Sequence, residues 1–264
     1  MKHKTMFFLV FVWVVVAMPG FCTLLHASDA DDKIATAFKN TYVYKTYLKD
    51  DTIQIEAKYD GVVALTGVVA DEAHKTLAGE TMANLPSVTR VDNQLVTSFN
   101  AAAAAGNEDE WIAKRVNLAL RLHHTAAGFS VLSVAVKDGV VTLEGMAASE
   151  VLIERAIVYA KDIEGVKDVR NKMAVSARLG PSEASEGSET LDDASVTALI
   201  VTALMTHRST SSAITRVTTR NGEVTLTGIA KNTDQYAAIV RHVTGIQGVI
   251  SVKNQMTIEN VPGK

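Results

Sequence analysis

The chain has 264 residues, 47% of them hydrophobic, and a formal net charge of −3. This composition supplies enough apolar material for packed cores. The charge is nearly balanced, no polybasic run occurs, and aromatic residues make up only 6% of the chain. These features argue against a nucleic-acid-binding protein, which needs a basic surface and often aromatic stacking platforms.

Residues 1–27 have the pattern of a secretory signal peptide. A lysine-containing start precedes an apolar run from Phe7 to Met18, which is shorter than the roughly 20 residues that cross a bilayer. Ala27 offers a small residue at the cleavage point, so we expect an exported protein. Two alternatives stay open. The segment could be retained as a membrane anchor, or Cys22 could carry a lipid, although the bulky Phe21 before it disfavours lipidation.

Cleavage after Ala27 would remove Cys22, the only cysteine of the chain. The mature protein would then have no disulfide and no thiol chemistry, although its compartment would be oxidising.

One seven-residue pattern, Gly-x-Val-x-Leu-x-Gly, occurs three times in the chain. Each copy is followed by an asparagine 26 residues after its second glycine. Identical spacing in three places indicates a tandem array of one small module. The motif residues are Gly61, Gly67 and Asn93; Gly139, Gly145 and Asn171; and Gly222, Gly228 and Asn254.

The motif spacing predicts three repeats, at residues 31–98, 108–176 and 191–260. Residues 177–190 are small, polar and acidic, and so predict a flexible linker that cannot bury enough surface to fold. The alanine run at 101–105 separates the first two repeats, or else extends the first helix of repeat 2, because alanine is the best helix former.

Within each repeat the same four elements are expected in chain order. An amphipathic helix begins at acidic residues such as Asp192 and Asp193, which favour the positive end of the helix dipole or cap the helix. A hairpin follows, with Asp-Gly or Asn-Gly at its turn, then a second helix and a last strand. The predicted fold is α+β, with the order α-β-β-α-β, and two helices cover one face of a three-stranded mixed sheet.

Repeat 1 departs from its partners in three places. Ile53 and Ile55 are out of phase with the apolar residues of the repeat 2 hairpin, which predicts a bulge or a longer turn. Gly79 lies within the second helix and should make it the least stable of the three. Ser87 replaces the turn glycine of the other repeats, which predicts a different turn geometry.

The second glycine of each motif shares a strand face with the apolar residues before it. We therefore expect it to point at the helices, where a side chain would hold a helix off the sheet.

The pattern resembles the BON domain, a bacterial module of about 60 residues. The match is carried by the glycines, apolar positions and asparagine of Asp138–Gly145 and Ile163–Asn171, with their equivalents in the other repeats. The resemblance implies an exported periplasmic protein of osmotic stress, without catalysis. It also implies a role in binding phospholipid surfaces or in assisting envelope proteins.

No recurring catalytic, cofactor-binding or metal-binding constellation is evident in the sequence. His123 and His124 are adjacent, and neighbouring helix positions point about 100° apart, so the pair suits one metal poorly and the solvated end of a helix is favoured. The glycine pattern flanks a strand and lacks the lysine of a phosphate-binding loop. We therefore expect a non-enzymatic protein without cofactor or metal.

The three recurring asparagines have two interpretations. Their amides could face a ligand, or they could bond to nearby backbone at a strand irregularity. The backbone interpretation is favoured, because three ligand sites would need three pockets.

Surface binding leaves weaker signals. In repeat 2, Trp111 lies near Lys114 and Arg115, and it suits either a membrane interface or a staple over the helix start. Repeat 3 is the least acidic, and its basic residues could meet anionic lipid headgroups or serve only solubility. Those residues are Arg208, Arg216, Arg220, Lys231, Arg241 and Lys253.

These signals support two functions: a module that binds anionic phospholipid, or a chaperone or scaffold that engages envelope clients by avidity. The sequence leaves open the arrangement of the repeats and the oligomeric state.

Overall fold

The computed structural model describes residues 29–98, 108–123, 129–176 and 191–259. The predicted signal peptide, Cys22, the alanine run and the 177–190 linker lie outside these residues. In the described part of the chain no helix is long and apolar enough to cross a membrane.

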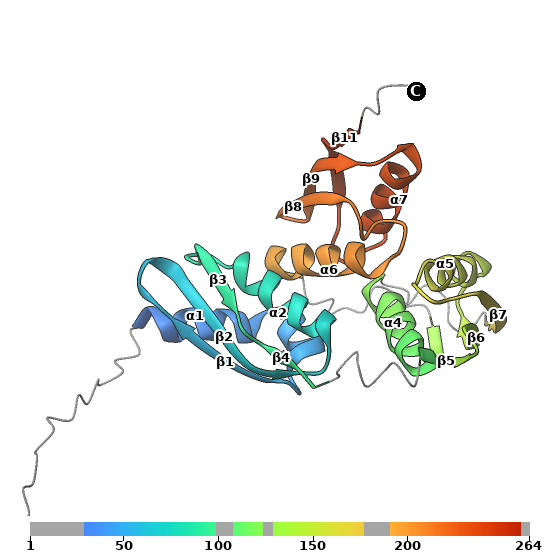
Figure 1. The fold of residues 1–264 in the computed structure, drawn as a ribbon, viewed down its shortest axis with the longest axis horizontal. Helices are drawn as coiled ribbons and strands as arrows, with labels where there is room; N and C mark the ends of the chain where they lie inside the picture. The colour runs from blue at the N-terminus through green and yellow to red at the C-terminus, as the bar shows by residue number, and fades with distance from the viewer. Residues whose placement is uncertain (1–28, 99–107, 124–128, 177–190, 260–264) are drawn as a thin grey trace, which may run out of the picture.

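The structure confirms an α+β fold built from three α-β-β-α-β repeats (Figure 1). Repeat 1 comprises α1 (Asp29–Asn40), β1 (Thr52–Ala57), β2 (Val62–Val69), α2 (Glu72–Ala83), β3 (Arg90–Asn93) and β4 (Val96–Thr97). Repeat 2 comprises α4 (Glu108–Leu122), β5 (Phe129–Lys137), β6 (Val140–Ala147), α5 (Glu150–Lys161) and β7 (Asp168–Val175). Repeat 3 comprises α6 (Asp193–Thr206), β8 (Ile214–Arg220), β9 (Glu223–Ala230), α7 (Thr233–Thr244), β10 (Ser251–Asn254) and β11 (Thr257–Ile258).

The sheet of each repeat is mixed. The second hairpin strand lies in the middle, antiparallel to the first strand and parallel to the last. In repeats 1 and 3 the last strand is interrupted just after Asn93 and Asn254, which divides it into two short strands.

The asparagines bond to the backbone at this place in all three repeats, although β7 of repeat 2 is not interrupted there. The side-chain oxygens of Asn93, Asn171 and Asn254 each accept a hydrogen bond from the backbone N–H two residues on, at 3.3, 2.8 and 2.9 Å. The backbone interpretation of these residues is therefore confirmed. Asn93 also donates to the Lys75 carbonyl of α2, and a Cβ at Gly79 would lie 2.5 Å from its amide nitrogen. Gly79 thus makes room for this bond.

The hairpin turns follow the sequence. Asp138 and Gly139 have φ of 54° and 79°, as a two-residue turn with both residues left-handed requires, and repeat 3 has the same geometry. Repeat 1 has the longer turn predicted for it. Its strands pair as far as Ala57 and Val63, and the Lys58 N–H bonds to the Val62 carbonyl around a short 3₁₀ segment.

Two expectations about single residues are wrong. Gly67 and Gly228 have φ of 120° and 130°, and a Cβ there would lie 2.0 and 1.9 Å from a carbonyl oxygen of the paired strand. The paired strand, not a helix, is what excludes a side chain. Ser87 does not change the turn geometry either, because its φ of 70° is close to the 84° of its counterpart Gly165.

Repeats 1 and 3 share one hydrophobic core, to which Leu122 at the end of α4 also belongs, whereas the other core residues of repeat 2 form a separate cluster. Helix α6 lies between the sheet of repeat 3 and helix α2 of repeat 1 (Figure 1), and it is buried along nearly its whole length. Helix α2 is covered on two sides, by its own sheet and by α6, which is why its apolar pattern matches a one-sided helix poorly.

A short π-helical segment, Tyr44–Leu48, extends repeat 1 beyond α1 and fastens it to the others. Just before it, the Tyr42 and Val43 N–H groups donate to Asp192 and Ser195 at the start of α6. The Tyr47 hydroxyl donates to the Arg121 carbonyl of repeat 2. The three repeats therefore form one packed assembly.

Candidate functional site

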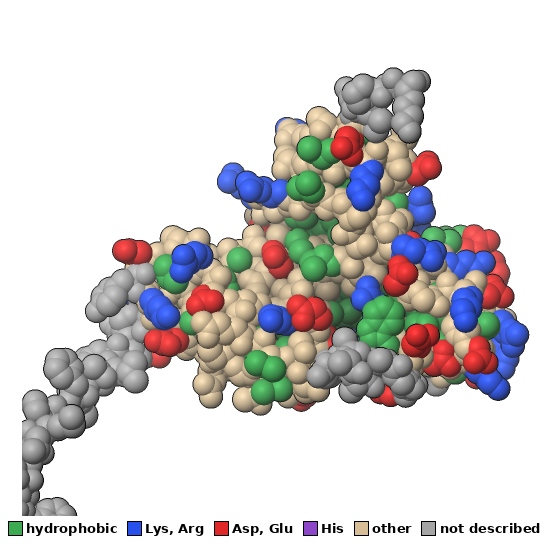
Figure 2. Space-filling view, in the orientation of Figure 1, with side chains coloured by type: hydrophobic (Ala, Val, Ile, Leu, Met, Phe, Trp, Pro, Cys, Tyr) green, Lys and Arg blue, Asp and Glu red, His purple; other side chains and the backbone are tan. Residues whose placement is uncertain are grey.

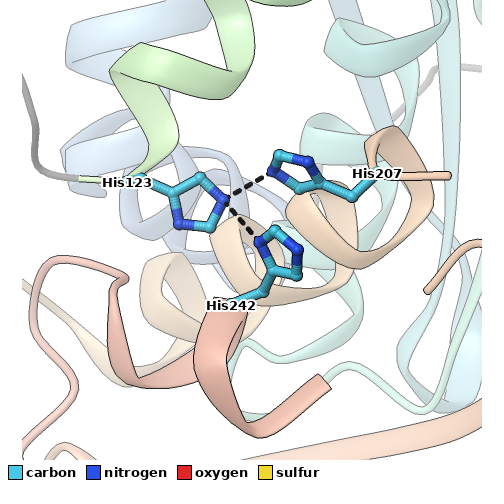
Figure 3. Close-up of side chains that lie close together, drawn as sticks. All are labelled: His123, His207 and His242. Carbon is cyan, nitrogen blue, oxygen red and sulfur yellow. Dashed lines mark hydrogen bonds between the residues drawn. The ribbon is translucent and has the colours of Figure 1, made fainter. Parts of the chain in front are cut away.

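A buried cluster of three histidines lies where repeat 2 meets repeat 3 (Figure 3). His123 follows the end of α4, His207 caps the end of α6, and His242 lies in the last turn of α7. Nε2 of His123 is 2.7 Å from Nε2 of His207 and 3.3 Å from Nδ1 of His242. The three side chains converge on one point, and their residues are 3%, 0% and 1% exposed.

Asp162, the C-cap of α5, closes one side of the cluster. Its carboxylate accepts a hydrogen bond from Nε2 of His242 at 3.0 Å and lies 3.7 Å from Nδ1 of His207. The backbone N–H and hydroxyl of Ser209 both donate to the same carboxylate. On the other side, the Tyr159 ring stacks on His123 with centroids 3.9 Å apart.

Burial sets the charge of the cluster. Loss of solvent lowers the pKa of His123 to about 3, with a further contribution from His242. It lowers the pKa of His207 to about 2, with the two other histidines adding to the effect. Burial alone would raise the pKa of Asp162, but hydrogen bonds from His242 and Ser209 outweigh it and leave this pKa below its ordinary value. At neutral pH His123 and His207 are therefore neutral beside an ionised carboxylate.

The sequence did not predict this cluster, because His123 was considered only as a possible metal pair with the adjacent His124, which lies outside the described residues. The partners that the structure supplies are 84 and 119 residues away. One signal was present: His123 and His207 both stand 14 residues after an aspartate, Asp109 or Asp193, at the start of the first helix. The same position, at the end of the first helix, is therefore a histidine in both repeats, which is a signal that these two helix ends could meet where the repeats pack.

The second candidate surface is the sheet face that the helices leave open in repeat 3. Along β8 the exposed residues Arg216, Thr218 and Arg220 alternate with Val217 and Thr219, which face the core. Lys253 of β10 lies on the same face, since it pairs with Thr225, which in turn pairs with Thr218. Figure 2 shows Lys and Arg side chains projecting from repeat 3 on the side of β8.

The structure thus gathers three of the six basic residues singled out in repeat 3. Arg208 lies instead at the junction with repeat 2, where its guanidinium donates to the Lys161 carbonyl. Arg241 of α7 lines a hollow at that junction, beside Val158 and Tyr159. Lys231 is exposed in the loop before α7.

One exposed apolar position recurs on the open sheet faces. The residue after the second glycine is Val68, Met146 or Ile229, and these are 48%, 49% and 45% exposed. In repeat 3 the exposed Ile214 pairs directly with Ile229, which enlarges the apolar end of the face.

The Trp111 group of repeat 2 lies in a groove of about 430 Å³ that all three repeats line. The Arg115 guanidinium stacks 4.6 Å from the centre of the Trp111 ring and donates to the Thr206 carbonyl of repeat 3. Lys114 forms an ion pair with Glu110 one turn earlier. Asp71 and Glu72 of repeat 1 also line the groove. Arg115 therefore takes part in the contact between repeats.

Comparison with known proteins identifies the module. The family model of the BON domain matches residues 30–98, 108–177 and 192–260. The chain is 30% identical over 151 residues to Osmotically-inducible protein Y of Escherichia coli (strain K12), covering 56% of this chain and 72% of that protein.

Two solved structures show weaker likeness. The C-terminal domain of CdsD, a structural protein of the type III secretion system of Chlamydia trachomatis, is 18% identical, with a TM-score of 0.23, covering 82% of this chain and 95% of that one. The periplasmic domain of PrgH from S. typhimurium is 9% identical, with a TM-score of 0.21, covering 80% and 100%. At these scores neither likeness bears on function.

Proposed function

The chain belongs to the BON domain family, with three copies of the domain, and we propose that it is a periplasmic envelope-stress protein that binds anionic phospholipid. The family and the relative named for osmotic induction support a non-enzymatic role in osmotic or envelope stress. The predicted signal peptide at residues 1–27 supports the location.

The observation that carries the lipid proposal is the open sheet face of repeat 3. It presents three cations, Arg216, Arg220 and Lys253, against one anion, Glu223. Each cation near an anionic membrane contributes up to about 1 kcal/mol. The exposed Ile214 and Ile229 at one end of this face would enter the headgroup region and add apolar burial.

The open faces of the other repeats provide an internal comparison. In repeat 1 the corresponding face carries Glu56 and Asp92 against Arg90. In repeat 2 the open face carries three cations, Lys137, Arg170 and Lys172, against two anions, Glu144 and Asp168, and Lys172 is paired with Glu144 across the strands. Repeat 3 therefore has the most cationic of these open faces, and we expect it to dominate binding.

Co-sedimentation with phosphatidylglycerol vesicles at low salt tests the proposal. The triple variant Arg216→Gln, Arg220→Gln, Lys253→Gln should lose most of the bound fraction. A control variant with Lys33, Lys39 and Lys49 of repeat 1 changed to Gln carries the same net charge change at exposed sites off the sheet, and should bind like the unmodified chain. Equal losses in both variants would show that only net charge matters and would contradict a site on repeat 3.

A second function, as a chaperone or scaffold for envelope clients, is favoured by the recurring exposed position at Val68, Met146 and Ile229. Three such positions in one chain could hold a client by avidity. Replacing all three with Ser should abolish suppression of aggregation of an unfolded outer-membrane protein. Unchanged suppression would exclude these positions as the client surface.

A further inference from the structure

Three ring nitrogens converge at the junction of repeats 2 and 3, and we propose that His123, His207 and His242 bind one zinc-class divalent metal ion there. The site goes beyond the lipid function, since it lies in the interior and not on an open sheet face.

The distances suit such an ion. Zinc binds imidazole nitrogen at about 2.0–2.1 Å in tetrahedral geometry, which places the ligand atoms about 3.3 Å from one another. Here one pair is 2.7 Å apart, a second is 3.3 Å apart, and all three ligand atoms lie within 4.8 Å of each other. Small rotations of the rings would open the short pair and place an ion between all three.

The hydrogen bonds of the cluster also favour an ion. Since Nε2 of His242 donates to Asp162, the Nδ1 of His242 carries a lone pair, and it faces Nε2 of His123. That same Nε2 also faces Nε2 of His207. A proton on His123 would have to serve both neighbours, and a proton on His207 instead would leave the lone pairs of His123 and His242 facing each other. A metal ion accepts the lone pairs of all three rings.

The surroundings resemble those that proteins build around a metal. Histidine ligands commonly donate their second N–H to a carboxylate, which fixes the tautomer and makes the ring a better donor. Asp162 takes this role for His242 and lies 3.7 Å from the second nitrogen of His207.

The ion would join two repeats. His123 comes from repeat 2, whereas His207 and His242 come from repeat 3. Tyr159 and Asp162, which flank the cluster, each line a surface hollow of about 360 Å³, and these hollows offer entry routes. A ligand that binds only the folded state stabilises it by mass action, so zinc should raise the melting temperature of the chain.

The test is a zinc titration of the full chain after removal of metal with EDTA, in competition with a fluorescent chelator. We expect one ion per chain and a higher melting temperature. His207→Gln should weaken binding by more than roughly 100-fold, the upper end of what losing a partner of a ligand costs. The matched control is His74→Gln: His74 also bonds a carboxylate, Asp51 at 2.7 Å, but lies outside the cluster, and its loss should leave zinc affinity unchanged.

X-ray absorption of the zinc-loaded, unmodified chain needs no variant, and so decides the question even if His207→Gln does not fold. Three imidazole ligands are expected. A shell with fewer than three imidazoles, the absence of one-to-one binding, or full affinity in a folded His207→Gln chain would each overturn the proposal.

Discussion

Ser87 occupies a backbone conformation that its counterparts in the other repeats fill with glycine. Its φ is 70°, where Gly165 and Gly248 have 84° and 87°. A non-glycine residue in this region destabilises the folded state by roughly 1–2 kcal/mol. Replacement by glycine would remove this strain, but it would also raise the entropy of the unfolded chain and so offset part of the gain. Serine at this place therefore stores strain in repeat 1.

Ser87→Gly should accordingly stabilise the protein by about 0.5–1 kcal/mol, as measured by urea denaturation. The reverse change, Gly248→Ser, should destabilise it, because a Cβ there would lie 2.7 Å from a Val196 methyl group. A loss of stability in Ser87→Gly would mean that the serine makes a contribution other than its backbone conformation.

The buried histidines predict a pH dependence. His123 and His207 have folded-state pKa values of about 3 and about 2, well below the unfolded value of 6.5. Their stabilising effect is therefore complete above pH 6.5 and is lost as the pH falls below it, by up to about 1.4 kcal/mol per pH unit for each ring. The lowered pKa of Asp162 acts in the same direction at lower pH, and Arg115 further disfavours charge on His207.

Urea denaturation in EDTA between pH 7.5 and 5 measures this effect without metal. The free energy of unfolding should fall as the solution is acidified, and less steeply in His207→Gln. If the unfolding free energy changed equally with pH in the two proteins, His207 would not be a neutral ring in the folded interior.

At the scale of elements, an aspartate joins the first helix of repeats 2 and 3 to the hairpin turn. Asp193 accepts hydrogen bonds from the backbone N–H groups of Asn221 and Gly222 at 2.7 and 2.9 Å. Asp109 makes the same two bonds to Asp138 and Gly139. The acidic helix starts therefore do more than favour the helix dipole, because they hold the turn against the helix.

Asp193→Ala should cost about 1.5–3 kcal/mol of unfolding free energy, since charge-assisted bonds to two N–H groups are lost. Asp234→Ala is the matched control, because Asp234 also lies in the first turn of a helix but is exposed. Its loss should cost no more than the dipole effect, about 0.3–1 kcal/mol. If both variants lost the same unfolding free energy, Asp193 would act only through the helix dipole and not through its bonds to the turn.

Elements with a local cause were predictable from the sequence. The Asp-Gly and Asn-Gly turns, the order of helices and strands and the asparagine bonds to backbone all depend on residues close in the chain. Gly67 was misjudged because its neighbour Thr52 lies on the paired strand, and strand register is not visible in a seven-residue motif.

Contacts between repeats were not predictable in the same way. Helix α6 has little polar surface, with buried residues from Ala194 to Thr206 around its circumference, which indicates a helix covered on all sides. That pattern does not say what covers it. The histidine cluster was missed for the same reason, since its members meet only when repeats 2 and 3 pack.

In the whole molecule, repeats 1 and 3 share a core although repeat 2 separates them in sequence. With this packing the sheet faces opposite the helices stay exposed to solvent. It also brings repeats 2 and 3 together at the place where the three histidines meet. If the repeats were independent, one face of α6 would be exposed to solvent. Instead Ser195 on that helix is buried and accepts a hydrogen bond from the Val43 N–H of repeat 1.

Hydrogen exchange over α6, Asp193–Thr206, measures this most directly, because amides inside a shared core exchange only on global unfolding. We expect α6 to be the slowest-exchanging of the described helices, and we expect Ser195→Ala, which removes an acceptor for the buried Val43 N–H, to speed exchange in both α6 and α2. Exchange of α6 at the rate of the more exposed helix α7, with no effect of Ser195→Ala on α2, would contradict the shared core.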